Sequence, residues 1–321
     1  YEDMKKLMLS LIISVACTGM IYAADLTVES QTQHYKDAEH KIDLKGNVKV
    51  KYDDINVVSP KAEVLIDADA GKVEKVKFFD NAYSYQVKDD KKHEVKARIL
   101  EVSLLNKVFK AEERTQSTIL KNQEPKVIVT ADSQEYDNKR NVMKAKGGVI
   151  IFYEDAQAFA DYAQVDLDKN NDLKRLTLIG HANVKKEKSS VVANKFVHYA
   201  DTEVTMASGK VFSDINDEQT QIKVWSDFQQ IDQKSNVITA SGHAIIHYQD
   251  YVAEGPKASV FPDPNTQKMN KVVFLGRSKI TQQGRSIEAD RIDMTLKPKD
   301  FKADGNVKTF IPNVGSSQEA L

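Results

Sequence analysis

Apolar and polar residues alternate along most of the chain with a period close to two. In the segment GNVKVKY at residues 46–52, Val48, Val50 and Tyr52 fall on one side, and polar residues separate them. This alternation is typical of a β-strand with one buried face. Turn sequences such as Asp-Ala-Gly and Asp-Pro-Asn separate the alternating runs, and no sustained 3.6-residue apolar stripe follows residue 25. The pattern predicts an all-β chain.

The alternating segments repeat. Residues 46–67 have a near-copy at 242–263, with eight identities in 22 positions, and a looser copy at 147–168. Shorter units begin near residues 46, 81, 112, 147, 180, 209, 242, 276 and 305. One such unit has too few strands to bury its own apolar face, but stacked units bury each other's. We therefore expect two long antiparallel sheets folded over one another and extended along one axis.

Small residues recur at one register of this pattern. Alanine occupies equivalent apolar-facing positions at residues 62, 97, 163, 193, 258 and 289. Such residues either leave room in an interior or let the two sheets close at one edge. For the domains, the repeat predicts a first region over residues 25–146, a continuous second region over 147–312, and a flexible tail over 313–321.

The start of the chain has the order of a secretory signal peptide. After a three-residue extension, Met4 is followed by two lysines, an apolar run over residues 7–15, and small residues that predict cleavage after Ala23 or Ala24. The apolar run is shorter than a membrane span. Two alternatives are a retained anchor and lipoprotein processing at Cys17. Cleavage after Ala23 or Ala24 would leave no cysteine, because Cys17 is the only one, and would exclude disulfides.

Charge narrows the choice of partners. The chain has 46 basic and 47 acidic residues, so no bulk field favours nucleic acid or an anionic membrane. We expect no nucleic-acid partner.

The candidate polar sites have simpler structural explanations. His243 and His247 would lie about 13 Å apart on one strand, too far to share a metal ion, and we expect both to face solvent. The acidic clusters fall where turns belong, and Asp54 and Asp67 recur as Asp250 and Asp263. A turn residue recurs along a repeat more readily than a catalytic acid does. These clusters are Asp53-Asp54, Asp67 with Asp69, and Asp89-Asp90.

Three further features of the sequence also indicate no catalytic or metal site. The basic run at residues 185–188 predicts a solvated hairpin, with contact to a lipid phosphate as the alternative. Trp225, the only tryptophan, is placed either in the core or at the mouth of a groove. The chain contains no phosphate-binding loop, dinucleotide fingerprint, nucleophile elbow or zinc-protease motif. We predict no catalytic residue, no metal and no cofactor.

A family resemblance emerges from these residues. A signal peptide followed by repeats of the form G-x-V-x-V-x-Y-x-D and then A-x-x-A-x-V-x-x-D resembles the LptA/OstA family of periplasmic lipopolysaccharide-transport proteins. The resemblance covers about residues 26–311 and is best at 46–79, 147–182 and 242–276. It implies a twisted β-jellyroll, open at both ends, whose apolar groove shelters lipid acyl chains.

The resemblance also implies partners. Such proteins join head to tail through edge strands, between an inner-membrane Lpt complex and an outer-membrane translocon, with lipopolysaccharide or a related lipid as cargo. The strand pattern starts by Leu26, and Gly305 opens a further unit, so neither end shows a polar capping repeat. The alternative is that short strands, charges or loops cover both edges.

The hypothesis is thus a non-enzymatic periplasmic lipid carrier or bridge. Its groove residues are predicted to be Val48, Val50, Tyr52, Val149, Ile151, Tyr153, Ala244, Ile246 and Tyr248. Two rival hypotheses are a membrane-tethered subunit of the inner-membrane complex and a β-solenoid carbohydrate-binding protein or enzyme.

Overall fold

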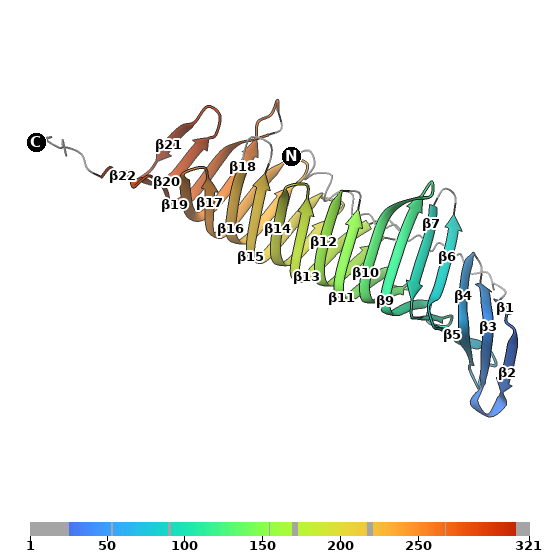
Figure 1. Cartoon of the computed structure of the whole chain (residues 1–321). Helices are drawn as coiled ribbons and strands as arrows, with labels where there is room; N and C mark the ends of the chain where they lie inside the picture. Colours follow the sequence, from blue (N-terminus) through green and yellow to red (C-terminus); the bar gives the residue numbers. More distant parts are fainter. Residues whose placement is uncertain are drawn as a thin grey trace, which may run out of the picture. The chain divides into compact units, whose positions relative to one another are not determined.

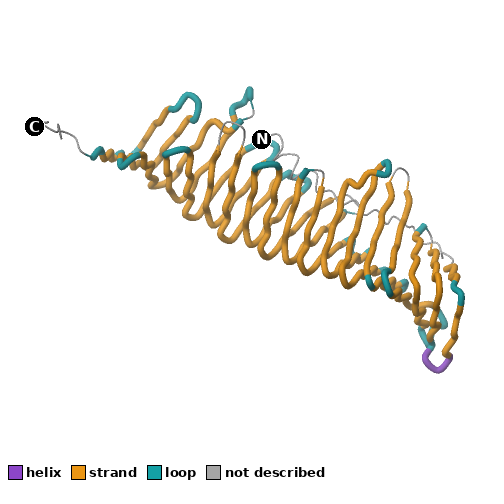
Figure 2. Tube along the Cα trace, viewed as in Figure 1, coloured by secondary structure: helices purple, strands orange, loops and turns teal. Residues whose placement is uncertain are grey.

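A computed structural model describes residues 26–312, except residues 53, 89, 90, 154, 169–172, 217–220 and 267. The described residues form 22 β-strands and one 3₁₀ turn, so the all-β prediction is confirmed (Figures 1 and 2). The predicted signal peptide, Cys17, the predicted tail, Asp53 and the pair Asp89-Asp90 lie outside the described residues.

The described strands belong to two compact units, which divide between Gly180 and His181. The predicted boundary between repeat regions, at residue 147, lies inside the first unit and stays a prediction. The strands of the first unit, with the turn η1 (Asp37–Glu39), are β1 (Leu26–Glu29), β2 (Thr32–Lys36), β3 (Lys41–Tyr52), β4 (Ile55–Ile66), β5 (Val73–Phe79), β6 (Ala82–Lys88), β7 (Lys91–Ala97), β8 (Ile99–Ser103), β9 (Val108–Lys121), β10 (Glu124–Asp137), β11 (Val142–Tyr153) and β12 (Ala156–Leu167).

β13 (Leu173–Lys186) carries the chain across the division. The second unit continues with β14 (Ser189–Tyr199), β15 (Val204–Asn216), β16 (Gln221–Asp232), β17 (Val237–Tyr248), β18 (Tyr251–Pro262), β19 (Met269–Gln282), β20 (Arg285–Thr295), β21 (Asp300–Asp304) and β22 (Lys308–Phe310).

In the first unit, each long strand is bent so that its two halves belong to different layers. Residues 41–45 of β3 pair with β2, whereas residues 49–52 of the same strand pair with β1. β4 does the same, with one half on β5 and the other on β6. The first layer continues through β5, β8 and residues 108–112 of β9, and the second through β6, β7 and residues 116–121 of β9. All of these pairings are antiparallel.

The bends coincide with the unit starts of the sequence repeat. At most of them, two successive residues have positive φ, as at Gly46 (81°) with Asn47 (46°) and Gly147 (78°) with Gly148 (52°). Glycine adopts this left-handed region without steric cost, which explains its recurrence in the first position. Each unit start in the sequence therefore marks a corner, where a strand passes from one layer to the other.

Each corner glycine also receives a side chain from the neighbouring strand. A Cβ added to Gly147 would overlap the Asp132 carboxylate, and one added to Gly180 would overlap Asp161. Further corners have the same arrangement, with Asn194 against Gly209, Asp227 against Gly242 and Asp290 against Gly305. The glycine is thus required twice, for its backbone conformation and for its lack of a side chain.

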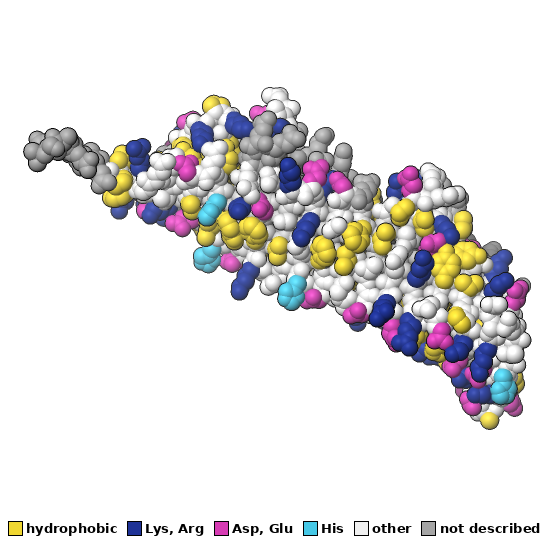
Figure 3. Space-filling view, viewed as in Figure 1, with side chains coloured by type: hydrophobic (Ala, Val, Ile, Leu, Met, Phe, Trp, Pro, Cys, Tyr) yellow, Lys and Arg dark blue, Asp and Glu magenta, His cyan; other side chains and the backbone are white. Residues whose placement is uncertain are grey.

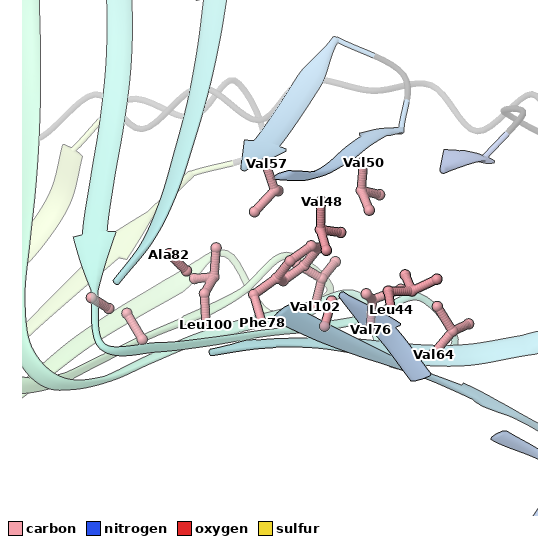
Figure 4. Packing of buried hydrophobic residues seen from close by; sticks show 13 residues of the cluster. Leu44, Val48, Val50, Val57, Val64, Val76, Phe78, Ala82, Leu100 and Val102 are labelled. Atoms are coloured by element: carbon pink, nitrogen blue, oxygen red, sulfur yellow. The ribbon is translucent and has the colours of Figure 1, made fainter. Parts of the chain in front are cut away.

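The core of the first unit lies between its two layers. Figure 4 shows Val48, Val50 and Val57 of the second layer facing Phe78 and Leu100 of the first. Val48 and Phe78 are completely buried, and the others are at most 5% exposed. Full burial of such side chains contributes roughly 1.5–3 kcal/mol each. The recurring alanines are buried as well, with Ala62, Ala97, Ala163, Ala193, Ala258 and Ala289 at most 5% exposed.

The second unit repeats the same construction. Its strands β14 to β20 pair in sequence order, each with the next, and each ladder is interrupted by a register shift near its middle. The ladder between β18 and β19 has a second shift, between Phe261 and Pro262. Gln86 donates to Asp54 Oδ2 at 2.6 Å in the first unit, and Gln282 donates to Asp250 Oδ2 at 2.8 Å in the second. This equivalent contact shows that the internal repeat extends to side-chain hydrogen bonds. Charged side chains of both signs are interspersed on the face shown in Figure 3.

Replacing a corner glycine should cost more than replacing a glycine that only has positive φ. We expect Gly147→Ala to lower the free energy of unfolding by about 3 kcal/mol, from left-handed strain plus overlap with Asp132. The matched control is Gly71→Ala, where φ is +62° but no atom lies within 4 Å of the added Cβ, and the expected loss is about 1 kcal/mol. Urea unfolding followed by circular dichroism measures both, and equal losses would contradict the overlap.

Candidate functional site: the interior between the two layers

The predicted groove residues all point between the layers. The six on β3 and β11 lie in the first unit, and the three on β17 lie in the second. Tyr52 and Tyr153 are half-buried. The remaining seven are at most 5% exposed: Val48, Val50, Val149, Ile151, Ala244, Ile246 and Tyr248. Their burial places them in the interior, and their role in binding lipid stays a prediction.

Three cavities lie in the interior of the first unit. The central one has a volume of about 110 Å³ and is flanked by smaller ones of about 10 and 40 Å³. Ile55 and Phe109 line both the central and the smallest cavity, whereas Ile119 and Met143 line both the central and the third. The three cavities are therefore neighbours in one line, separated by side chains only.

Three of the nine predicted groove residues line the two flanking cavities, and none of the nine lines the central one. Val50 and Tyr52 line the smallest, and Ile151 lines the third. An apolar cavity of about 150 Å³ accepts a ligand the size of benzene. The central cavity is smaller, so a whole acyl chain enters this interior only if the two layers move apart.

The two walls of the central cavity differ in chemistry. The first layer contributes mainly apolar side chains, and the second layer contributes most of the polar ones. The first-layer wall includes Leu100, Phe109, Ala111, Tyr136 and Met143. The second-layer wall includes the side chains of Ser84, Gln86, His93 and Ser117, together with Ile55, Val95 and Ile119. Sequence reasoning missed this polar wall, although the strand AYSYQVK does place Ser84 and Gln86 in the inward register with Ala82.

An inward glutamine anchors a polar network beside the cavity. Ser117 Oγ donates to Gln134 Oε1 at 2.6 Å, and Gln134 Nε2 donates to Thr115 Oγ1 at 2.9 Å and to the Val129 carbonyl at 3.2 Å. In the second unit, Ser213 Oγ donates in the same way to Gln229 Oε1 at 2.6 Å. Each network satisfies an amide that the neighbouring apolar residues cannot satisfy.

Two histidines face the interior, one in each unit: His93 is half-buried and His198 is buried. Burial lowers the pKa of His93, with a further contribution from the nearby Lys91 charge. Its Nδ1 atom is inaccessible to solvent and has no hydrogen-bond partner among the described residues. His198 is 4% exposed and its Nδ1 lies 2.9 Å from Thr205 Oγ1. Burial lowers the pKa of His198 to about 4.

The polar sites that were discounted from sequence lie where turns and solvent were expected. Asp67 Oδ1 accepts hydrogen bonds from the backbone N–H groups of Asp69 and Ala70, as Asp263 does from residues 265 and 266. His243 and His247 are both exposed. Among the described residues, no three His, Cys, Asp or Glu side chains group as metal ligands.

The prediction for the single tryptophan was wrong. Trp225 lies neither in the core nor at a groove mouth. It alternates with buried Val224 and Ser226 and packs outside, with ring centroids 5.0 Å from Phe212 and 4.7 Å from His247. The solvated hairpin predicted over residues 185–188 is confirmed at Lys185, Glu187 and Lys188, which are exposed. Lys186 alone is only 6% exposed, because it shares the inward register of Ala182 and Val184.

These features define a class of protein: a two-layered β-jellyroll of stacked strand pairs around an apolar interior. Residues 27–115 match the family model described as LptA/(LptD N-terminal domain) LPS transport protein. This match confirms the predicted resemblance for that segment and relates the chain to lipopolysaccharide transport.

Comparisons with curated proteins and with solved structures give no further support for a function. No curated protein matches the chain. A crystal structure of LptH, the LptA-homologous periplasmic component of the lipopolysaccharide transport device from Pseudomonas aeruginosa, is 14% identical. The match covers 58% of this chain and 94% of that one, with a TM-score of 0.19, which is too low to support an argument from shape. In the part of the chain that the structure describes, no helix is long and apolar enough to cross a membrane.

The buried His198 should make the second unit sensitive to acid. Its pKa is about 4 when folded and about 6.5 when unfolded, so the unfolded state binds more protons as pH falls below 6.5. We expect the free energy of unfolding to fall by about 2 kcal/mol between pH 8 and pH 5 from this group alone. Trp225 fluorescence in urea at each pH measures the loss, since this single tryptophan lies in the second unit.

The variant His198→Gln tests the assignment, because an amide does not titrate in this range. It should remove most of the loss, whereas His243→Gln at an exposed histidine should leave it in place. An undiminished loss in His198→Gln would contradict this explanation.

Proposed function

We propose that the chain is a periplasmic lipopolysaccharide-transport protein without enzymatic activity, which shelters acyl chains between its two layers. The observation that carries the proposal is the line of cavities through an apolar interior, which begins in the segment that matches a transport family and continues beyond it. Acyl chains need apolar area rather than directional chemistry, and burial contributes about 0.8 kcal/mol per methylene. A line of weak apolar sites suits a carrier, because no single site holds the cargo tightly.

The small size of the cavities fits this function if the layers separate when lipid enters. The corners join the layers along one edge, and turns between strands lie at the other ends of the strands. Separation would exchange contacts between the layers for contacts with methylenes of similar polarity. The net cost of opening is therefore reduced by the lipid itself.

We further propose that the ends of the strand array associate with other strands. Val307 is 51% exposed, although the equivalent residues two positions after Gly46 and Gly147 are buried, namely Val48 and Val149. Tyr35 is 54% exposed, although its equivalent in the repeat, Tyr136, is 6% exposed. Interior positions are thus exposed on β2 and immediately before β22. Addition of a strand from a second copy, an inner-membrane complex or an outer-membrane translocon would cover them.

Photocrosslinking tests the lipid site. A photoreactive residue at position 151 or 246, which point inward, should crosslink to lipopolysaccharide in cells. The matched controls are the adjacent positions 150 and 245, which point outward and should crosslink at background level. Crosslinking is read by blotting for lipopolysaccharide, and equal signals from inward and outward positions would overturn the assignment.

The same interior positions can be tested by charge. Ile151→Asp and Ile246→Asp should weaken crosslinking from a photoreactive residue at the other inward position, because a buried carboxylate disfavours contact with methylenes. Circular dichroism checks that each variant remains folded.

End association can be tested separately. Val307→Asp should weaken association by at least tenfold, because a charge would be buried beneath the added strand. Sedimentation velocity over a range of concentrations measures self-association, and the control is Val252→Asp, an outward apolar residue that is 37% exposed. Equal effects from both variants would argue against an interface at β22.

A further inference from the structure

The central cavity of the first unit has a feature that sheltering an alkyl chain does not require. Its second-layer wall holds side-chain hydroxyl, amide and imidazole groups, whereas the facing wall is apolar apart from Gln134, Glu135 and Lys144. The flanking cavities on both sides are lined mostly by apolar side chains. Most of the polar groups therefore lie in the middle of the line, and Ser117 and Gln134 also reach the third cavity.

His93 is the least satisfied of these polar groups. Gln86 lies directly opposite it on β6 and is held by Asp54 Oδ2 at 2.6 Å, while Ser117 is held by Gln134 at 2.6 Å. His93 Nδ1 is inaccessible to solvent and unpartnered among the described residues. A buried polar atom without a partner costs roughly 1–3 kcal/mol, and a purely alkyl chain in the cavity would leave that cost in place.

The charges around the cavity disfavour an ionic ligand group. The carboxylates of Glu94 and Glu135 are already paired with lysines, Glu94 with Lys92 and Glu135 with Lys110 and Lys144. Burial keeps His93 in its neutral form. His93 Nδ1 donates or accepts a hydrogen bond according to its tautomer, so a suitable ligand group is neutral and can do both. A hydroxyl group has these properties.

We propose that the central cavity is a specificity site for an acyl chain that carries a hydroxyl group between its methylenes, with His93 as the residue that binds the hydroxyl. The proposal rests on the proposed function, since the chain must first enter the interior. Methylenes on either side of the hydroxyl would occupy the two flanking cavities, which hold Val50 and Tyr52 on one side and Ile151 on the other.

A pair of matched fatty acids tests the proposal on the full-length processed protein. Octadecanoic acid and its 12-hydroxy derivative differ only in a mid-chain hydroxyl. We expect the hydroxylated acid to displace a fluorescent fatty-acid probe with about tenfold higher affinity, the equivalent of one hydrogen bond to a buried group. His93→Leu should abolish this preference and leave the affinity for octadecanoic acid unchanged or higher. His243→Leu, at an exposed histidine, should retain the preference.

The outcomes separate the two proposals. If neither acid displaces the probe, the proposed lipid-binding function fails and this inference with it. If both bind equally to the unaltered protein, lipid binding stands and the hydroxyl site is overturned. If the preference survives in His93→Leu, the assignment to His93 is overturned. Should His93→Leu fail to fold, the ¹⁵N shifts of His93 in the unaltered protein decide, since only the hydroxylated acid should move them.

Discussion

The structure depends on one backbone constraint, the left-handed residues at the corners, which come in successive pairs at most of them. A strand of 12 to 14 residues, such as β3 or β9, would otherwise run straight and leave one face exposed. Two successive positive φ values, as at Gly46 and Asn47, turn it so that both halves direct apolar residues into one interior. Because the corner belongs to the strand itself, the two layers are covalently joined at every corner. The hydrophobic core, the cavities and the inward polar residues all follow from that geometry.

Much of the fold could be predicted because the determinants are local and repeated. Period-two alternation identified the buried residues of β3, β11 and β17, and the recurring glycines marked the unit starts. The corners at Asp80-Asn81 and Glu113-Arg114 carry no glycine, so only their spacing indicated them. The polar wall at Ser84, Gln86 and His93 was missed, because alternation counts apolar residues and these inward positions are polar. The prediction for Trp225 was wrong because alternation was not followed there: a large aromatic residue was expected to face inward, but it occupies an outward position.

The interior combines two kinds of binding surface. Valine and isoleucine side chains from both layers provide apolar contact area, which does not fix the position of an acyl chain. The inward glutamines Gln134 and Gln229 fix polar networks at equivalent places in the two units. Apolar area alone gives affinity with little selectivity, whereas buried polar groups discriminate strongly between ligands that do and do not satisfy them. Selection of cargo would therefore reside in a few inward polar residues.

The corner geometry also determines how the number of strands in such a chain can change during evolution. Each corner uses only residues of one strand and a side chain of its neighbour, as with Gly147 and Asp132, or Gly242 and Asp227. Duplicating or deleting one pair of strands would leave every other corner and its local contacts intact. The cross-section of the interior would be preserved while its extent changed. Tandem duplication is thus a mutation that this architecture tolerates, and the identities between residues 46–67 and 242–263 are the trace such an event would leave.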